Sequence, residues 1–155
     1  MKSIAAGIKK KLESNNINFG NKILIGLSGG ADSVFMTEIL SIIFSTDNIY
    51  CMHINHGLRE TAMNDELFVR DYCAVKNLKL AVEKFDVKKF AESNKLSIET
   101  AGRILRYRAF DDFIAANKID YLATAHNADD NIETFFMRLL RGTGLNGLGC
   151  MNFIR

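Results

Sequence analysis

The stretch that decides the fold spans residues 22–44 and reads KILIGLSGGADSVFMTEILSIIF. Residues 22–27 form a short, mainly apolar run bounded by polar residues, which is typical of a buried strand. Residues 34–44 are apolar enough for a helix that faces a core, and Ser33 or Asp32 can cap its N-terminus. A strand, a Gly-rich turn and a helix are therefore predicted to follow one another directly.

The turn between this strand and helix is predicted to bind an anion. It consists of six residues, Ser28, Gly29, Gly30, Ala31, Asp32 and Ser33. The backbone N–H groups of such a turn and the positive end of the helix dipole converge on one point, where phosphate is the usual ligand. The two glycines let the backbone approach a phosphate closely, and the two serine hydroxyls can donate to its oxygens. Asp32 is available to a metal ion on the phosphate, while a glycine turn that merely starts a helix is the alternative.

The 155-residue chain has the composition of an ordinary globular protein, with 48% hydrophobic and 25% charged residues. Its length suits one domain with its own core and is too short for two domains of ordinary size. No apolar run approaches the ~20 residues that span a membrane, and the N-terminus lacks the apolar core of a signal peptide. The cysteines form no CxxC pair, which argues against a disulfide scaffold or a cysteine-ligated metal and suits a reducing compartment. We therefore expect a cytoplasmic protein with no membrane partner.

Strand-like and helix-like segments alternate along the chain. A basic amphipathic helix opens it, and after residues 22–44 we expect strands at 49–54, 79–85 and 121–125, with helices at 60–76, 86–93, from Ser97 onward and at 129–141. This alternation predicts βαβ crossovers, and hence an α/β fold with a parallel twisted sheet covered by helices on both faces. In such a sheet, ligands bind beyond the carboxyl ends of the strands.

Polar residues follow three of the predicted strands, so they are expected to share that edge of the sheet. The first strand leads to residues 28–33, the second to 53–59 (HINHGLR) and the fourth to 125–130 (AHNADD). A phosphate site that faces the paired carboxylates Asp129 and Asp130 suggests a magnesium nucleotide, because Mg²⁺ is normally held by one or two carboxylates plus phosphate oxygens. Stabilisation of a helix dipole is the alternative role for these two acids.

Further candidate residues lie on two of the predicted helices. Glu133 follows the aspartates by one turn and can present another acid to the same crevice. Arg103 and Arg106 are three residues apart on the helix that begins near Ser97, so both guanidinium groups can face one way and clamp a polyphosphate. An ion pair between Arg103 and Glu99 is the alternative.

Two other patterns carry less weight. His53, His56 and His126 all fall on the predicted edge, so a zinc site is an alternative, but strand-end residues three apart need not converge and the phosphate loop would be left unexplained. Residues 142–147 match GxGxxG formally. They follow a helix rather than a strand, and too little chain remains for a βαβ unit, so we discount the match.

Four motifs, in this order and spacing, resemble those of the tRNA(Ile)-lysidine synthetase family of ATP pyrophosphatases (the PP-loop superfamily). SGGADS (28–33) resembles the nucleotide loop, and HINHGLRE (53–60) resembles the second-strand loop. ETAGRILRYRAF (99–110) is similar to the arginine helix, usually ARxxRY, with Gly102 where Ala is common. ATAHNADDNIETFFMRLLRGTGLNGLGCM (123–151) resembles the block that ends in RLLRGxGxxGLxxM. Related 2-thiocytidine enzymes share the loop but depend on CxxC pairs, which this chain lacks.

The resemblance implies a two-step ligase with a Rossmann-like fold of the adenine nucleotide alpha hydrolase type. ATP would bind with its triphosphate on residues 28–33 and its adenine near Ile54 and His56. The 2-carbonyl oxygen of the wobble cytidine, in an isoleucine tRNA with a CAU anticodon, would attack the α-phosphate and release pyrophosphate. Free L-lysine would then displace AMP from the adenylated base, giving lysidine and changing the codon read from AUG to AUA.

The resemblance also implies roles for the charged residues. Asp32, Arg103, Arg106 and Asp129 would be catalytic, since phosphoryl transfer depends on positioning and charge neutralisation more than on covalent help. Of these, Asp32 and Asp129 would hold Mg²⁺. Binding of the lysine ammonium groups by charge pairing would fall to Asp130 and Glu133.

The resembling family continues beyond the last motif into further domains that grip the tRNA, whereas this chain ends at Arg155. We therefore expect residues 1–155 to be a single, truncated N-terminal ATP pyrophosphatase domain that binds ATP and Mg²⁺ weakly and modifies tRNA poorly or not at all on its own. Two other functions stay open. One is another enzyme of the superfamily, such as a tRNA thiolase or an amidotransferase-type synthetase, and the other is a non-catalytic nucleotide-binding module.

Overall fold

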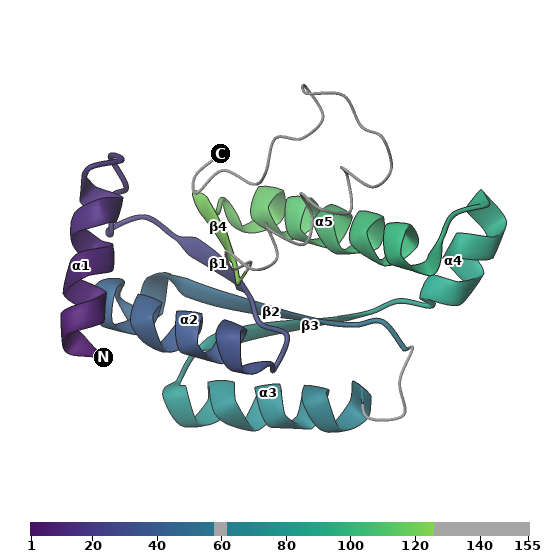
Figure 1. Ribbon diagram of the computed structural model, residues 1–155, viewed down its shortest axis with the longest axis horizontal. Helices are drawn as coiled ribbons and strands as arrows, with labels where there is room; N and C mark the ends of the chain where they lie inside the picture. The colour runs from purple at the N-terminus through teal and green to yellow at the C-terminus, as the bar shows by residue number, and fades with distance from the viewer. Residues whose placement is uncertain (58–61, 126–155) are drawn as a thin grey trace, which may run out of the picture. The chain divides into compact units, whose positions relative to one another are not determined.

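A computed structural model describes residues 1–57 and 62–125 of the chain (Figure 1). The elements in order are α1 Lys2–Glu13, β1 Ile23–Gly26, α2 Ala31–Ile43, the 3₁₀ turn η1 Thr46–Asn48, β2 Ile49–Asn55, α3 Ala62–Lys76, β3 Lys79–Lys84, α4 Val87–Asn94, α5 Ile98–Asn117 and β4 Tyr121–Thr124. The predicted alternation of strands and helices is confirmed up to β4. The predicted helix at 129–141 lies outside the described residues.

The strands of the described part form one parallel sheet in the order β3-β2-β1-β4. Ile23 at the start of β1 pairs with Ile49 of β2 on one side and with Tyr121 of β4 on the other. Helices α2 and α3 cover one face of the sheet, and α5 covers the other with α4 beside it (Figure 1). The predicted α/β class is thus confirmed, and because all strands run the same way their C-terminal ends share one edge.

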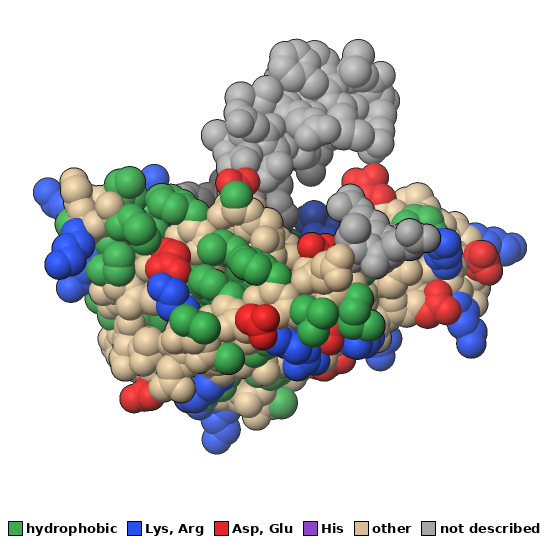
Figure 2. Space-filling model, turned by 90° about the horizontal axis from the view of Figure 1, so that it is seen from below, with side chains coloured by type: hydrophobic (Ala, Val, Ile, Leu, Met, Phe, Trp, Pro, Cys, Tyr) green, Lys and Arg blue, Asp and Glu red, His purple; other side chains and the backbone are tan. Residues whose placement is uncertain are grey.

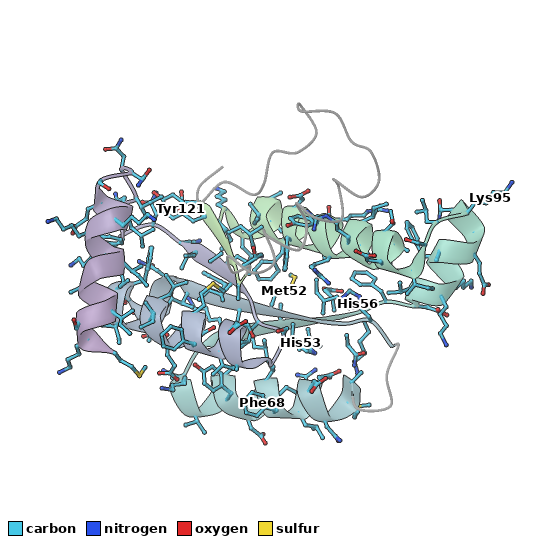
Figure 3. All side chains as sticks on the ribbon, in the orientation of Figure 1. Met52, His53, His56, Phe68, Lys95 and Tyr121 are labelled. Carbon is cyan, nitrogen blue, oxygen red and sulfur yellow. The ribbon has the colours of Figure 1, made fainter. Side chains whose placement is uncertain are left out.

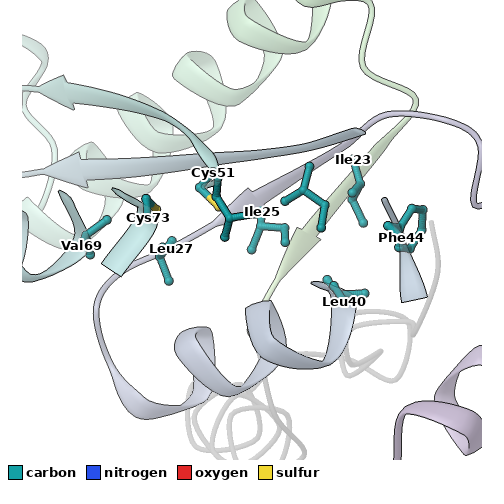
Figure 4. Packing of buried hydrophobic residues seen from close by; sticks show 10 residues of the cluster. Ile23, Ile25, Leu27, Leu40, Phe44, Cys51, Val69 and Cys73 are labelled. Atoms are coloured by element: carbon teal, nitrogen blue, oxygen red, sulfur yellow. The ribbon is translucent and has the colours of Figure 1, made fainter. Parts of the chain in front are cut away.

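Successive residues of the central strands supply the cores on the two faces. Ile23, Ile25 and Cys51 pack toward α2 and α3 (Figure 4), whereas Leu24 and Met52 pack beneath α5. All five are at most 5% exposed. Burial on both faces explains why β1 and β2 appear in the sequence as nearly continuous apolar runs rather than alternating ones.

The start of α2 differs from the sequence prediction. The helix begins at Ala31 with Gly30 as its N-cap, without a side-chain cap, so the predicted cap at Ser33 or Asp32 is wrong. The left-handed backbone of Gly29 (φ +91°) turns the chain one residue earlier, and Val34 N–H already donates to the carbonyl of Gly30 (3.1 Å).

The predicted start of the arginine helix α5 at Ser97 is confirmed. Ser97 precedes the helix, and its hydroxyl oxygen accepts a hydrogen bond from Thr100 N–H (3.1 Å). This bond satisfies one of the N–H groups that the first turn of a helix leaves without an internal partner. The position of Arg103 and Arg106 along α5 is therefore set by a local signal that the sequence carries.

The outer side of α2 and α3 carries apolar side chains among charged ones (Figure 2). The exposed large apolar residues of these two helices are Phe35, Ile42, Met63, Leu67, Phe68 and Val75. A polar bridge also joins the helices, since Glu38 accepts hydrogen bonds from the Tyr72 hydroxyl and the Lys76 ammonium group (both 2.8 Å). No helix in the described part of the chain combines the length and apolarity needed to cross a membrane.

Candidate functional site

The Gly-rich turn follows β1 and leads into α2 at the C-terminal edge of the sheet. Gly29 is favoured there because its φ of +91° is unfavourable for other residues, and a Cβ at this position would contact Val69 Cγ2 of α3 at 3.4 Å. Sequence reasoning attributed this glycine to close approach of a phosphate. The structure adds a requirement of the fold itself, because the turn packs directly on α3.

The two serine hydroxyls of the turn bond within the turn. Ser33 Oγ donates to the carbonyl of Gly30 (2.9 Å), so in its contact with Ser28 Oγ (3.0 Å) it acts as the acceptor. Ser28 Oγ in turn accepts from Gly30 N–H (3.3 Å). Ser33 is only 3% exposed, so its hydroxyl shapes the turn from beneath.

The N-terminus of α2 leaves backbone N–H groups directed outward from the helix. Val34 N–H is the first to bond into the helix, so the first turn of α2 begins at Ala31 with its N–H groups at the end of the helix. Ala31 and Asp32 are exposed. This end of α2 therefore has the donors and the positive dipole that an anion site requires.

The strand end beside the turn is tied to it by His53. Its Nδ1 lies 2.9 Å from the carbonyl oxygen of Leu27, so Nδ1 carries the proton and donates. Leu27 N–H in turn donates to the carbonyl of Met52 (2.9 Å). His53 is 3% exposed, and Figure 3 shows it on the opposite side of β2 from Met52. The structure therefore places His53 under the turn as a support.

His56 and Arg106 connect the end of β2 with the arginine helix. His56 Nε2 lies 3.4 Å from Arg106 Nη2, and because a guanidinium can only donate, Nε2 is the acceptor and Nδ1 carries the proton. Burial lowers the pKa of His56, and the positive charge of Arg106 and the neighbouring His53 lower it further. A neutral imidazole thus holds the Arg106 guanidinium at this edge.

Arg103 has a different partner from Arg106. Its guanidinium lies over the ring of Tyr107, 5.0 Å from the centroid, and its side chain is exposed. The alternative ion pair with Glu99 is not among the salt bridges of residues 1–57 and 62–125. Of the two predicted arginines, the structure brings Arg106 to the residues after β2 and holds Arg103 against its own helix.

The sequence patterns did not single out a buried carboxylate that lies beside the site. Glu66 of α3 is 4% exposed and accepts hydrogen bonds from Asn55 Nδ2 (3.0 Å) and Arg70 Nη2 (2.9 Å), while Lys84 Nζ lies 3.1 Å away. The Asn55 hydrogen bond lowers its pKa most, against the opposing effect of burial, and Lys84 and Arg70 lower it further, to about 2. Helical spacing from Val69 and Cys73 marks position 66 as inward-facing, which is the signal that could have revealed it.

Four predicted site residues lie outside the described residues. They are His126, Asp129, Asp130 and Glu133. Within the described part, no group of three or more His, Cys, Asp and Glu residues could hold a metal ion, so the zinc alternative gains no support there.

Comparisons with known proteins agree with this architecture. A family model described as a PP-loop domain matches residues 2–155. A tRNA(Ile)-lysidine synthase from Pseudothermotoga lettingae is 41% identical over 147 residues, which cover 93% of this chain and 33% of the relative. One from Clostridium perfringens is 42% identical over 149 residues, which cover 91% of this chain and 32% of the relative. The chain thus spans about a third of the length of these curated relatives.

A solved structure shares the fold at low sequence identity. The U34-tRNA thiolase from Methanococcus maripaludis superposes with a TM-score of 0.76 at 19% identity, covering 94% of this chain and 51% of the thiolase. The PP-loop superfamily expected from the sequence motifs is confirmed by the family model, which extends over nearly the whole chain. With an SGGADS turn at the head of α2 and a family match from residue 2 to residue 155, the chain belongs to the PP-loop domain family.

Proposed function

We propose that this chain is the ATP-activating and lysine-transferring part of an enzyme that forms lysidine at the wobble cytidine of an isoleucine tRNA with a CAU anticodon. The observation that carries the proposal is that an anion-binding helix end and a paired arginine lie at the same edge of the parallel sheet. The N-terminus of α2 lies there after β1, and the His56–Arg106 pair lies there after the neighbouring strand β2. Similarity to tRNA(Ile)-lysidine synthases supports this reaction over others of the family.

ATP would bind with its triphosphate at residues 28–33. The outward N–H groups and the dipole of α2 would hold the phosphate oxygens, while the hydroxyls of Ser28 and Ser33 keep the turn in shape. The adenine would lie near Ile54 and His56 at the end of β2. A neutral His56 suits this position, because it adds no charge beside an uncharged base.

Charge neutralisation would come from side chains around the α-phosphate. Negative charge would develop there as the carbonyl oxygen of the base attacks, and we assign its neutralisation to Arg106, which contacts His56. Arg103 would supply a second guanidinium from the exposed side of α5. The exposed carboxylate of Asp32 fits the oxygen ligands that Mg²⁺ prefers, and we assign Mg²⁺ to Asp32 together with Asp129. Bound there, the ion would neutralise phosphate charge.

The second step requires a site for the other substrate. We assign the ammonium groups of L-lysine to Asp130 and Glu133, by charge pairing. Both steps then belong to residues 1–155, taken as a single domain that works in the cytoplasm, where tRNA and free lysine are present.

The test uses the chain with ATP, Mg²⁺, L-lysine and an isoleucine tRNA transcript carrying a CAU anticodon. We expect slow tRNA-dependent release of pyrophosphate and slow lysine-dependent release of AMP from this chain, both reduced further by Arg106→Gln and by a transcript in which the wobble cytidine is replaced. Titration calorimetry measures ATP binding separately. No ATP binding at millimolar nucleotide would contradict the proposal, and activity that needs a sulfur donor instead of lysine would indicate a thiolase.

A further inference from the structure

The amide of Asn55, the last residue of β2, is bonded at both ends. Its Oδ1 accepts from Gly57 N–H (3.0 Å), and its Nδ2 donates to Glu66 Oε2 (3.0 Å) and approaches the carbonyl of Ala62 (3.5 Å). Gly57 has a positive φ of +62°, so the chain turns sharply here. The side chain of Asn55 thereby closes the turn that carries His56.

Only one of the two orientations of the Asn55 amide supports this turn. A flipped amide would present its NH₂ group to Gly57 N–H, and two donors would face each other. Glu66 selects the working orientation because an ionised carboxylate can only accept hydrogen bonds. Arg70 and Lys84 are also donors, so the two carboxylate oxygens serve three donor groups.

We infer that Glu66 is a positioning residue of the nucleotide site, which acts through Asn55 to hold the turn after β2 and, with it, His56. The inference rests on the proposed function, in which His56 lies beside the adenine and holds Arg106. His56 stands between Asn55 and Gly57, so a turn that loosens would move its ring away from Arg106. Glu66 reaches the site from α3, an element to which the function assigns no other residue.

The donor and acceptor pattern provides a sharp test. In Glu66→Gln the new NH₂ group must face either Arg70 at the former Oε1 position or Asn55 and Lys84 at the former Oε2 position. When it faces Asn55, it favours the flipped Asn55 amide. In Asn55→Asp two carboxylates face each other. In the double variant N55D/E66Q, the carboxylate introduced at position 55 accepts from both Gly57 N–H and the amide introduced at position 66, so the pattern is complementary again. Matched controls are Arg70→Gln and Lys84→Gln, which remove a cation from Glu66 without touching Asn55.

Two measurements separate the positioning role from a general loss of stability. Hydrogen exchange of the Gly57 amide, followed by NMR, reports the turn, and calorimetry reports MgATP affinity, both well below the unfolding temperature. We expect each single variant at 55 or 66 to speed exchange and weaken MgATP binding about tenfold, the effect of one buried hydrogen bond. In the double variant, the Gly57 exchange rate and the MgATP affinity should return to within about threefold of the values of the original chain. In the controls, both quantities should change little.

Several outcomes would overturn the inference. The first is an unchanged exchange rate of the Gly57 amide in Glu66→Gln. The second is faster exchange of this amide with unchanged MgATP affinity. The third is a double variant whose exchange rate and MgATP affinity are no closer to those of the original chain than the values of the single variants. If Glu66→Gln does not fold, Asn55→Ala replaces it, because Glu66 then keeps both cations while Gly57 loses its acceptor. If the original chain binds no ATP, the proposed function fails and so does the link to the nucleotide, whereas the exchange experiment still decides whether Glu66 orients Asn55.

Discussion

Position 102 of α5 is a buried glycine that faces His56. A Cβ built there would lie 3.8 Å from His56 Nδ1 and from Val87 Cγ1, which is ordinary contact, and the backbone of Gly102 is helical. We expect Gly102→Ala to raise the free energy of unfolding by about 0.5–1 kcal/mol, because alanine loses less backbone entropy in a helix. Urea denaturation measures the change.

The matched control for this substitution is Gly29→Ala. Gly29 has a φ of +91° and lies against Val69, so alanine should lower the free energy of unfolding by about 1–2 kcal/mol at this position. A loss of stability in Gly102→Ala would show that the space beside His56 is smaller than the structure indicates.

The pKa of His56 gives a second prediction at the scale of a single residue. Burial lowers its pKa from the ordinary 6.5, and Arg106 and His53 add to the effect. We expect Arg106→Gln to raise the pKa of His56 only part of the way back, because burial, the larger cause, remains. NMR titration of the imidazole measures both values, and Arg108→Gln on the exposed side of α5 serves as the control.

The sign of the accompanying stability change follows from linkage. The unfolded chain, with the higher His56 pKa, binds a proton more readily, so this residue reduces stability as the pH falls below 6.5 toward the lower folded-state pKa. A His56 pKa at or above 6.5 in the original chain would contradict the assignment of a neutral ring.

At the scale of elements, the Phe110 ring of α5 reaches close to the backbone of β1. A Cβ on Gly26 would lie 3.0 Å from Phe110 Cζ, so the glycine leaves room for the ring against the strand. We expect Gly26→Ala to lower the free energy of unfolding by about 1–3 kcal/mol through overpacking. Combining it with Phe110→Leu should cost less than the sum of the two single substitutions, since the smaller side chain relieves the clash.

The control for this prediction is Gly7→Ala in α1, where a Cβ would have no neighbour within 4 Å. That substitution should stabilise the chain slightly. Additive costs for Gly26→Ala and Phe110→Leu in the double-mutant cycle would contradict the close contact.

At the scale of the domain formed by the described residues, two carboxylates bond to residues of neighbouring helices and strands and make the free energy of unfolding depend on pH in the acid range. Glu38 joins α2 to α3 through Lys76 and Tyr72, and Glu66 joins α3 to β2 and β3. The hydrogen bond from Lys76 is the main reason that the pKa of Glu38 is lowered from 4.5, and the Asn55 bond is the main reason that the pKa of Glu66 falls to about 2. Since the unfolded chain protonates first, the contribution of Glu66 is complete above pH 4.5 and is lost between pH 4.5 and about 2.

We therefore expect the urea midpoint of the original chain to fall steeply below pH 4.5 and that of Glu66→Gln to fall less. Tyr72→Phe is the control, because it removes a hydrogen bond from Glu38 and leaves Glu66 untouched. Identical pH profiles for Glu66→Gln and the original chain would show that Glu66 is not the group that titrates.

Much of this architecture follows from local features of the sequence. Apolar runs predict β1 and β2, Ser97 predicts the start of α5, and the Gly-rich stretch predicts an anion-binding turn between a strand and a helix. These features act over a few residues, through side-chain burial, capping and backbone freedom, so they can be recognised without a structure.

The tertiary structure alone decided which side chains meet across long separations. Asn55 and Glu66 are 11 residues apart, and His56 and Arg106 are 50 apart, so no local pattern relates them. The direction in which each arginine points also depends on neighbours from other elements, since Arg106 meets His56 while Arg103 stays on Tyr107 of its own helix. The sequence determined where strands and helices form, because those preferences are local. Packing determined which polar groups are buried together, because a hydrogen bond between distant residues exists only once the sheet and its helices have assembled.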